Sequence, residues 1–91
     1  MKGKNYEDVA KEIVDQMKII IGPVAITQAN LVKGLSVNKK VAIAGNGLEI
    51  IRQLVKRYKS IMGAVALTIA RNAVKPLLRK NPKLVIPEEL R

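Results

Sequence analysis

The sequence contains no cysteine, no histidine, no tryptophan and no phenylalanine. Without cysteine the chain has no disulfide, zinc ribbon, iron–sulfur cluster or thiol nucleophile, and without histidine it has no imidazole base or metal ligand. The serine, threonine and tyrosine hydroxyls that remain lie in no nucleophile elbow and beside no evident general base. We therefore expect a protein that is not an enzyme, that uses no cofactor or metal ion and that has no small-molecule substrate.

Long apolar segments are also missing. The longest uncharged apolar stretches, 19–26 and 61–70, are shorter than the roughly 17 to 25 residues that span a bilayer. Residues 1–7 lack the apolar core of a secretory signal. From these features we expect a soluble cytoplasmic protein.

Acidic residues are scarce beside basic ones. Seventeen lysines and arginines outnumber seven aspartates and glutamates, which gives a net charge of +10 over 91 residues. The composition, 48% hydrophobic and 26% charged, is typical of a folded globular protein, and this length predicts a single domain with a small core over residues 1–91. The excess charge indicates a polyanionic partner, such as nucleic acid or an anionic membrane surface.

The sequence resembles itself after a shift of 41 positions, the distance from Gly22 to Gly63. The identical pairs are Lys18 and Lys59, Ile20 and Ile61, Gly22 and Gly63, Val24 and Val65, Ala25 and Ala66, Thr27 and Thr68, and Ala29 and Ala70. Helical periodicity alone does not require matched glycines and alanines. We therefore predict an internal repeat with units at 6–34 and 47–80; a chance likeness of two amphipathic helices is the alternative.

Each unit has the pattern of a helical hairpin. In the first unit, apolar residues recur at helical spacing from about Tyr6, and Gly22-Pro23 predicts the end of that helix. A second helix is expected from Pro23 to about Lys33, with Gly34 as its stop.

The second unit follows Asn46, a favourable N-cap, and by analogy we expect a turn at Gly63. Because one glycine costs a helix only about 1 kcal/mol, a continuous helix through this unit is the alternative. Further on, Pro76 predicts a kink or a stop, and Asn81-Pro82 predicts the end of the helix.

Two segments lie outside the units. The linker, 35–46, has alternating apolar residues that suit a short strand or an irregular loop. The tail, 81–91, is expected to be extended, either laid over an apolar groove or offered to another subunit. The predicted fold class is thus all-α, with four helices arranged as two related hairpins.

The basic residues are concentrated in the second unit. Between Ile50 and Pro87 the chain has nine lysines and arginines and no acidic residue. Their spacing places them on shared helix faces, where like charges repel until phosphates neutralise them; a merely solvated face is the alternative. The predicted nucleic-acid-binding residues are Arg52, Lys56, Arg57, Lys59, Arg71, Lys75, Arg79 and Lys80.

Asp8, Glu12 and Asp15 share one face of the first helix. Lys11 and Lys18 lie within helical pairing distance, so we interpret this face as solvated and ion-paired, and predict no metal site there.

Ile21-Gly22-Pro23-Val24-Ala25, followed by Leu31-Val32-Lys33, resembles the glycine-proline motif of a small helical domain of unknown function that is appended to some bacterial signalling proteins, including protein kinases and cyclases. The segment from Gly63 to Lys75 is a degenerate second copy that departs from the motif at Ala64. The resemblance implies a helical accessory or interaction module, and it transfers no catalytic residue.

The leading hypothesis is binding of double-stranded nucleic acid through phosphate contacts with little sequence specificity, because two tyrosines are too few for base stacking. The alternatives are a protein-interaction or homodimerisation module whose charge is incidental, and peripheral attachment to an anionic membrane. A homodimer is expected because the fourth helix is too apolar for an exposed surface. The predicted interface residues are Ala66, Ile69, Ala70, Ala73, Leu84 and Ile86.

Overall fold

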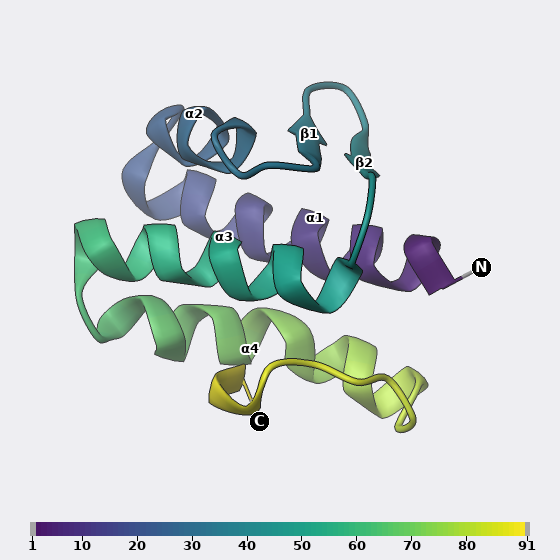
Figure 1. Ribbon diagram of the computed structural model, residues 1–91. Helices are drawn as coiled ribbons and strands as arrows, with labels where there is room; N and C mark the ends of the chain where they lie inside the picture. The colour runs from purple at the N-terminus through teal and green to yellow at the C-terminus, as the bar shows by residue number, and fades with distance from the viewer. Residues whose placement is uncertain (1, 91) are drawn as a thin grey trace.

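The computed structural model describes residues 2–90, with side chains from residue 6 to residue 90, as a mostly helical domain (Figure 1). Its elements are α1 (Lys2–Ile21), α2 (Val24–Asn30), β1 (Leu35–Val37), β2 (Val41–Ile43), α3 (Gly47–Met62), α4 (Val65–Lys80) and the short 3-10 helix η1 (Glu88–Leu90). The long helices α1, α3 and α4 pack against one another. The predicted helical character and the separation of α3 from α4 are confirmed. None of the described helices combines the length and the apolar character that crossing a bilayer requires.

The turn between α1 and α2 has the same local geometry as the turn between α3 and α4. Gly22 and Gly63 have φ angles of 72° and 76°, and each N–H donates to the carbonyl four residues earlier, at 2.9 and 2.8 Å. Positive φ suits glycine because it has no Cβ to clash with the backbone. The residues that follow, Pro23 and Ala64, have φ angles of −59° and −61°.

The linker forms an antiparallel hairpin in which Leu35 pairs with Ile43. Helix α2 ends at Asn30, before this hairpin, so the prediction that the helix reaches about Lys33 is wrong. The Asn30 side chain donates to the Val37 carbonyl at 2.8 Å and accepts from the Val37 N–H at 2.7 Å. These two bonds satisfy backbone groups that the short hairpin leaves unpaired, and they fix β1 against the end of α2.

Helix α4 continues through Pro76 to Lys80. Of the two outcomes expected at Pro76, the stop is therefore wrong and the kink stays a prediction, whereas the predicted end of the helix at Asn81 is confirmed. Proline removes the donor that would reach the Asn72 carbonyl. Asn72 and Pro76 are both exposed, so water can satisfy that carbonyl. The two hairpins therefore differ in length beyond the shared turns, and the origin of the units by duplication stays a prediction.

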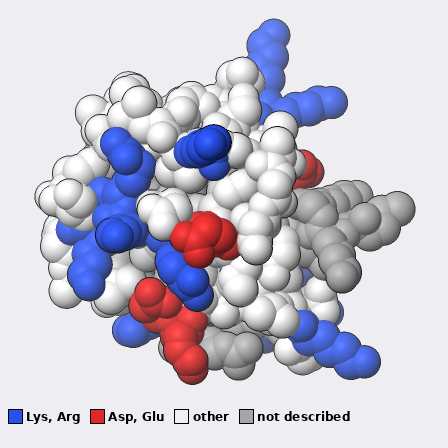
Figure 2. Space-filling view, in the orientation of Figure 1, with Lys and Arg blue, Asp and Glu red and all other residues white. Residues whose placement is uncertain are grey.

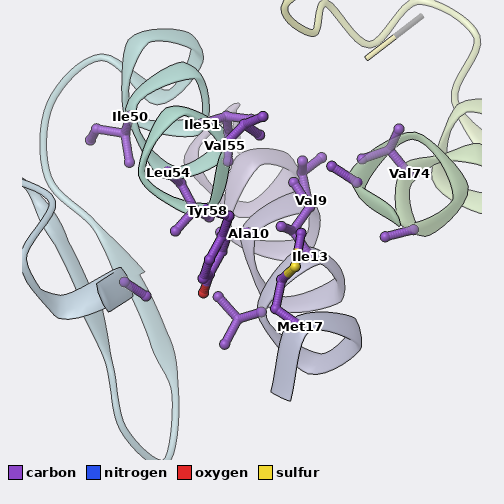
Figure 3. Packing of buried hydrophobic residues seen from close by; sticks show 14 of the residues in the cluster. Val9, Ala10, Ile13, Met17, Ile50, Ile51, Leu54, Val55, Tyr58 and Val74 are labelled. Carbon is purple, nitrogen blue, oxygen red and sulfur yellow. The ribbon is translucent and has the colours of Figure 1, made fainter. Parts of the chain in front are cut away.

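The core is apolar throughout the described residues, with no buried charged side chain among them. Tyr58 on α3 is the largest fully buried side chain, and it lies among Ile13 and Met17 of α1 and Leu54 of its own helix (Figure 3). Its hydroxyl donates to the Ala25 carbonyl of α2 at 2.6 Å. This bond satisfies the one polar group of the side chain and joins the end of α3 to the start of α2.

Residues 81–90 fold back over their own chain. Leu84, Ile86 and Leu90 are buried, and η1 packs on α4 (Figure 1). The Tyr6 hydroxyl donates to the Val85 carbonyl at 2.8 Å, while the Tyr6 ring packs so closely on Gly47 that a Cβ there would overlap it. The tail therefore lies over apolar surface of its own chain, which is one of the two courses predicted for it.

The matching backbone angles at Pro23 and Ala64 generate a stability prediction. In the variant Ala64→Pro, the new ring fits the existing φ of −61°, and no hydrogen bond of the Ala64 N–H occurs among the described residues. We expect stabilisation by about 0.4–1 kcal/mol, because proline restricts the unfolded chain. Urea unfolding followed by circular dichroism measures the change. In the comparison variant Gly63→Ala, the alanine must adopt φ 76° and ψ −157°, a conformation essentially restricted to glycine, so a loss of about 1–3 kcal/mol is expected.

Burial raises the pKa of Tyr58 well above the ordinary tyrosine value of about 10. Above pH 10 the unfolded chain releases this proton before the folded chain does, so the free energy of unfolding should fall as pH rises, whereas below pH 10 this contribution is constant. Tyr58→Phe should lose about 1–2 kcal/mol at pH 7, because the Ala25 carbonyl loses its donor.

The lysines titrate in the same pH range in wild type and in Tyr58→Phe. The difference between the unfolding free energies of these two proteins therefore isolates the contribution of the Tyr58 phenol. That difference should shrink between pH 10 and pH 11.5 in a series of urea titrations. A difference that stays constant with pH would contradict the assignment of the shift to this phenol.

Candidate nucleic-acid interface

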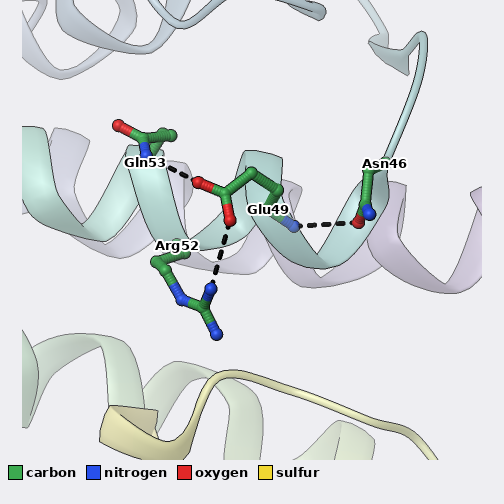
Figure 4. Close-up of polar contacts among 4 residues, drawn as sticks. All are labelled: Asn46, Glu49, Arg52 and Gln53. Atoms are coloured by element: carbon green, nitrogen blue, oxygen red, sulfur yellow. Dashed lines mark hydrogen bonds and ion pairs between the residues drawn. The ribbon is translucent and has the colours of Figure 1, made fainter.

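Helix α3 begins at a polar cluster that fixes its first turn (Figure 4). The Asn46 side chain accepts the Glu49 N–H at 3.1 Å, which confirms the predicted N-cap. The Glu49 carboxylate in turn accepts from Arg52 at 3.1 Å and from the Gln53 amide at 2.7 Å. Arg52 is therefore partly neutralised by an acidic residue of its own helix, and its guanidinium is held near the start of α3.

Further along α3, Lys56 and Lys59 follow Arg52 on one exposed face. Figure 2 shows lysine and arginine side chains gathered over the left part of α3, beside acidic atoms lower on the same surface. The three cations line a hollow of about 280 Å³ between α3, α4 and η1. Apolar atoms of Val55, Leu67, Pro87 and Leu90 also line this hollow, together with Glu89. We call Arg52, Lys56 and Lys59 the α3 cationic face.

Arg57 lies on another side of α3 and is only partly exposed. Its Nε donates to Oε1 of Gln28 at 3.3 Å, which joins α3 to α2. Arg57 is therefore separate from the α3 cationic face. This predicted nucleic-acid-binding residue instead forms a hydrogen bond within the protein.

On α4, Arg71, Lys75 and Arg79 recur every fourth residue, and the continuous helix places them along one side. Lys75, Arg79 and Lys80 are exposed. Arg71 is exposed as well, but its Nε donates to the Glu89 carbonyl at 2.7 Å and so holds η1 against α4. Arg71 thus has a structural contact that the spacing of charges in the sequence did not reveal.

The exposed lysines have few acidic neighbours. In the part of the chain that the structure describes, Lys56 and Lys59 form no ion pair within 4 Å, and the same holds for the lysines and arginines of α4. On α1, in contrast, Lys11 pairs with Asp15 at 2.9 Å, as the sequence predicted, and this hydrogen bond raises the pKa of Lys11. The described residues contain no group of acidic side chains arranged to hold a metal ion.

The predicted dimer-interface residues lie inside the single chain. Ala66, Ala70, Ala73, Leu84 and Ile86 are all buried, and Ile69 is partly buried. The alanines permit close packing of α4 within the bundle, and the tail covers further apolar surface of this helix. The six predicted side chains therefore offer no free face to a second copy, whereas homodimerisation itself stays a prediction.

The exposed apolar side chains lie elsewhere, and the sequence analysis did not single them out. They are Ile19, Ile20, Val24, Leu31, Ile61, Val65 and Val85. Five of these seven flank the turns at Gly22 and Gly63. The signal in the sequence was the run of isoleucines before Gly22, which is longer than one buried helix face can accommodate.

No family model, no curated protein and no solved structure matches this chain. The resemblance of the glycine-proline motif to a helical accessory domain accordingly stays a prediction.

Arg71 and Arg79 occupy equivalent positions on α4, but only Arg71 is bonded to η1. In Arg71→Gln we expect the Leu90 amide, which donates to the Pro87 carbonyl at 2.9 Å, to exchange with solvent several-fold faster, because the tail loses an anchor of about 1 kcal/mol. Hydrogen exchange followed by NMR measures this effect. Arg79→Gln removes the same charge and should leave Leu90 exchange unchanged; equal effects of the two variants would refute the anchoring role.

Proposed function

We propose that this protein binds double-stranded nucleic acid through phosphate contacts, without catalysis and with little sequence preference. The observation that carries the proposal is the α3 cationic face together with the exposed cations of α4. The α3 residues project from a helix whose first turn is capped by Asn46, and the lysines among them have no acidic partner within the described residues. The binding energy would come from release of the counterions that surround the phosphates.

Helix geometry spaces these charges suitably for a duplex. Arg52, Lys56 and Lys59 are separated by rises of about 6 Å and about 4.5 Å along α3. Duplex DNA presents a negative charge about every 1.7 Å along its axis, so a face with this spacing meets phosphates in any register. A contact of this kind favours affinity over sequence recognition.

The placement of the tyrosines favours a duplex over a single strand. Tyr58 is fully buried, and Tyr6 is partly buried between Gly47 and the tail. Neither ring is available as a platform on which unpaired bases stack. Gln53 and Arg71, whose polar side chains could otherwise reach a base edge, are also engaged, since Gln53 bonds to the Glu49 carboxylate and Arg71 to the Glu89 carbonyl.

The triple variant Arg52→Gln, Lys56→Gln and Lys59→Gln tests the α3 cationic face. Each lost phosphate contact lowers the slope of log K against log salt by about 0.9, so we expect a decrease of about 2 to 3 in that slope. Fluorescence anisotropy with a random-sequence duplex, titrated from 50 to 200 mM salt, measures it.

The matched control is Lys39→Gln, Lys40→Gln and Lys83→Gln, which removes the same charge from exposed positions outside α3 and α4. This control should lower the slope by much less. Equal slopes for both triple variants would mean that net charge alone drives binding, and absence of wild-type binding near 50 mM salt would refute the function.

A further inference from the structure

One end of the molecule is apolar, and the α3 cationic face does not include it. The side chains there are Ile19, 77% exposed, Ile20, 53%, Val24, 48%, Ile61, 48%, and Val65, 51%. We call these five residues the apolar end. They flank the turns at Gly22 and Gly63, which follow the last residues of α1 and α3.

Both turns lie at the left end of the bundle in Figure 1, where α1 and α3 finish. The hydrogen bond from Tyr58, in the last turns of α3, to Ala25, in the first turn of α2, joins these two helices there at 2.6 Å. Arg57 and Gln28 provide a second link between the same elements. The exposed aliphatic side chains therefore belong to the same end of the bundle.

Cations flank this end. Lys18 and Lys59 stand in the last turns of α1 and α3 and are both exposed. Figure 2 shows uncharged surface at the left-hand end beside the lysines and arginines over α3. The nearest acidic residue before Lys18 is Asp15, whose carboxylate is taken by Lys11 at 2.9 Å. Aliphatic side chains at the tip with lysines directly behind them make an amphipathic end.

We propose that the apolar end docks on an anionic phospholipid bilayer, with its isoleucines and valines in the boundary between headgroups and acyl chains and Lys18 and Lys59 at the phosphates. This arrangement follows the physics of interfacial anchors, in which buried aliphatic surface and attraction to anionic lipid act together. Lysine suits the position, because its long stem lies along apolar surface while its ammonium group stays in the headgroup layer.

Charge complementarity favours a bilayer over a second copy of the chain. Two copies that met through their apolar ends would bring Lys18 and Lys59 of one copy toward the same lysines of the other, and each copy carries a net charge of +10. Anionic lipid instead neutralises these lysines. A fluid bilayer also accepts side chains that protrude from two turns without a complementary groove.

The test is sedimentation of the full chain with vesicles of phosphatidylcholine alone and of phosphatidylcholine with one third phosphatidylglycerol. The variant Ile20→Ser with Ile61→Ser removes one aliphatic side chain from each turn. The matched control, Leu31→Ser with Val85→Ser, removes side chains that are 57% and 51% exposed outside the apolar end. We expect wild type and control to bind the anionic vesicles equally and the Ile20/Ile61 variant to bind at least tenfold more weakly.

The charge is tested separately with Lys18→Gln, which lies outside the α3 cationic face and should weaken vesicle binding about fivefold. Equal binding of the Ile20/Ile61 variant and the control would overturn the proposal, because adsorption would then come from charge alone. Equal binding to both vesicle compositions would overturn the role of the lysines. If the Ile20/Ile61 variant instead abolished self-association of a protein that ignores vesicles, the apolar end would be an interface between copies.

The absence of tryptophan from the chain gives a direct reporter of insertion. A single tryptophan at the tip, Ile20→Trp, should shift its emission to shorter wavelength with anionic vesicles, whereas Val85→Trp should not shift. Duplex binding of the Ile20/Ile61 variant should equal that of wild type, so the bilayer proposal and the nucleic-acid proposal stand or fail independently.

Discussion

The hydrogen bond between Tyr58 and the Ala25 carbonyl is the constraint on which the arrangement of the two halves depends. A phenol can occupy the centre of this small core only if its hydroxyl finds an acceptor, and the first turn of α2 supplies it at 2.6 Å. The acceptor is available because the Gly22 turn brings the start of α2 beside the end of α3. The two turns are thereby held at the same end of the bundle.

That placement decides which apolar residues are left outside. The core uses Ala25 and Ala29 of α2 and Ala66 and Ala70 of α4, small residues that let the helices approach closely. The larger side chains beside the two turns cannot enter without displacing this packing, so Ile19, Ile20, Val24, Ile61 and Val65 stay exposed. With no charged side chain buried among the described residues, the excess positive charge must also lie on the surface.

Much of the fold followed from the sequence, and the reasons are local. The Asn46 cap, the turns at Gly22 and Gly63 and the end of α4 at Asn81 each depend on chemistry within a few neighbouring residues. The early end of α2 depends on a pairing between Asn30 and Val37, seven residues apart across a loop, which periodicity does not encode. The stop at Pro76 does not occur because the exposure of Asn72 decides whether an unpaired carbonyl is tolerated, and exposure is a tertiary property.

The candidate site was predictable in composition and much less in arrangement. The sequence predicted every lysine and arginine of α3 and α4 as a binding residue. It could not predict the hydrogen bonds from Arg57 to Gln28 and from Arg71 to the Glu89 carbonyl, because those partners lie 29 and 18 residues away. The residues predicted for a dimer interface pack within the chain for a related reason, and homodimerisation itself stays a prediction. Alanine-rich α4 has the same pattern whether its partner is a second chain or, as here, α1, α3 and the tail.

The α3 cationic face and the apolar end share one residue, Lys59, and this sets the coupling between their proposed partners. Lys56 lies about 4.5 Å from Lys59 along the helix axis, within the screening length of about 8 Å at physiological salt, whereas Arg52 lies about 10 Å away. A phosphate bound at Lys59 therefore weakens the field felt by the other partner through Lys59 and its neighbour Lys56. A duplex and a bilayer would compete for Lys59, and their mutual effect on affinity should be about one to two phosphate contacts rather than the whole of either site.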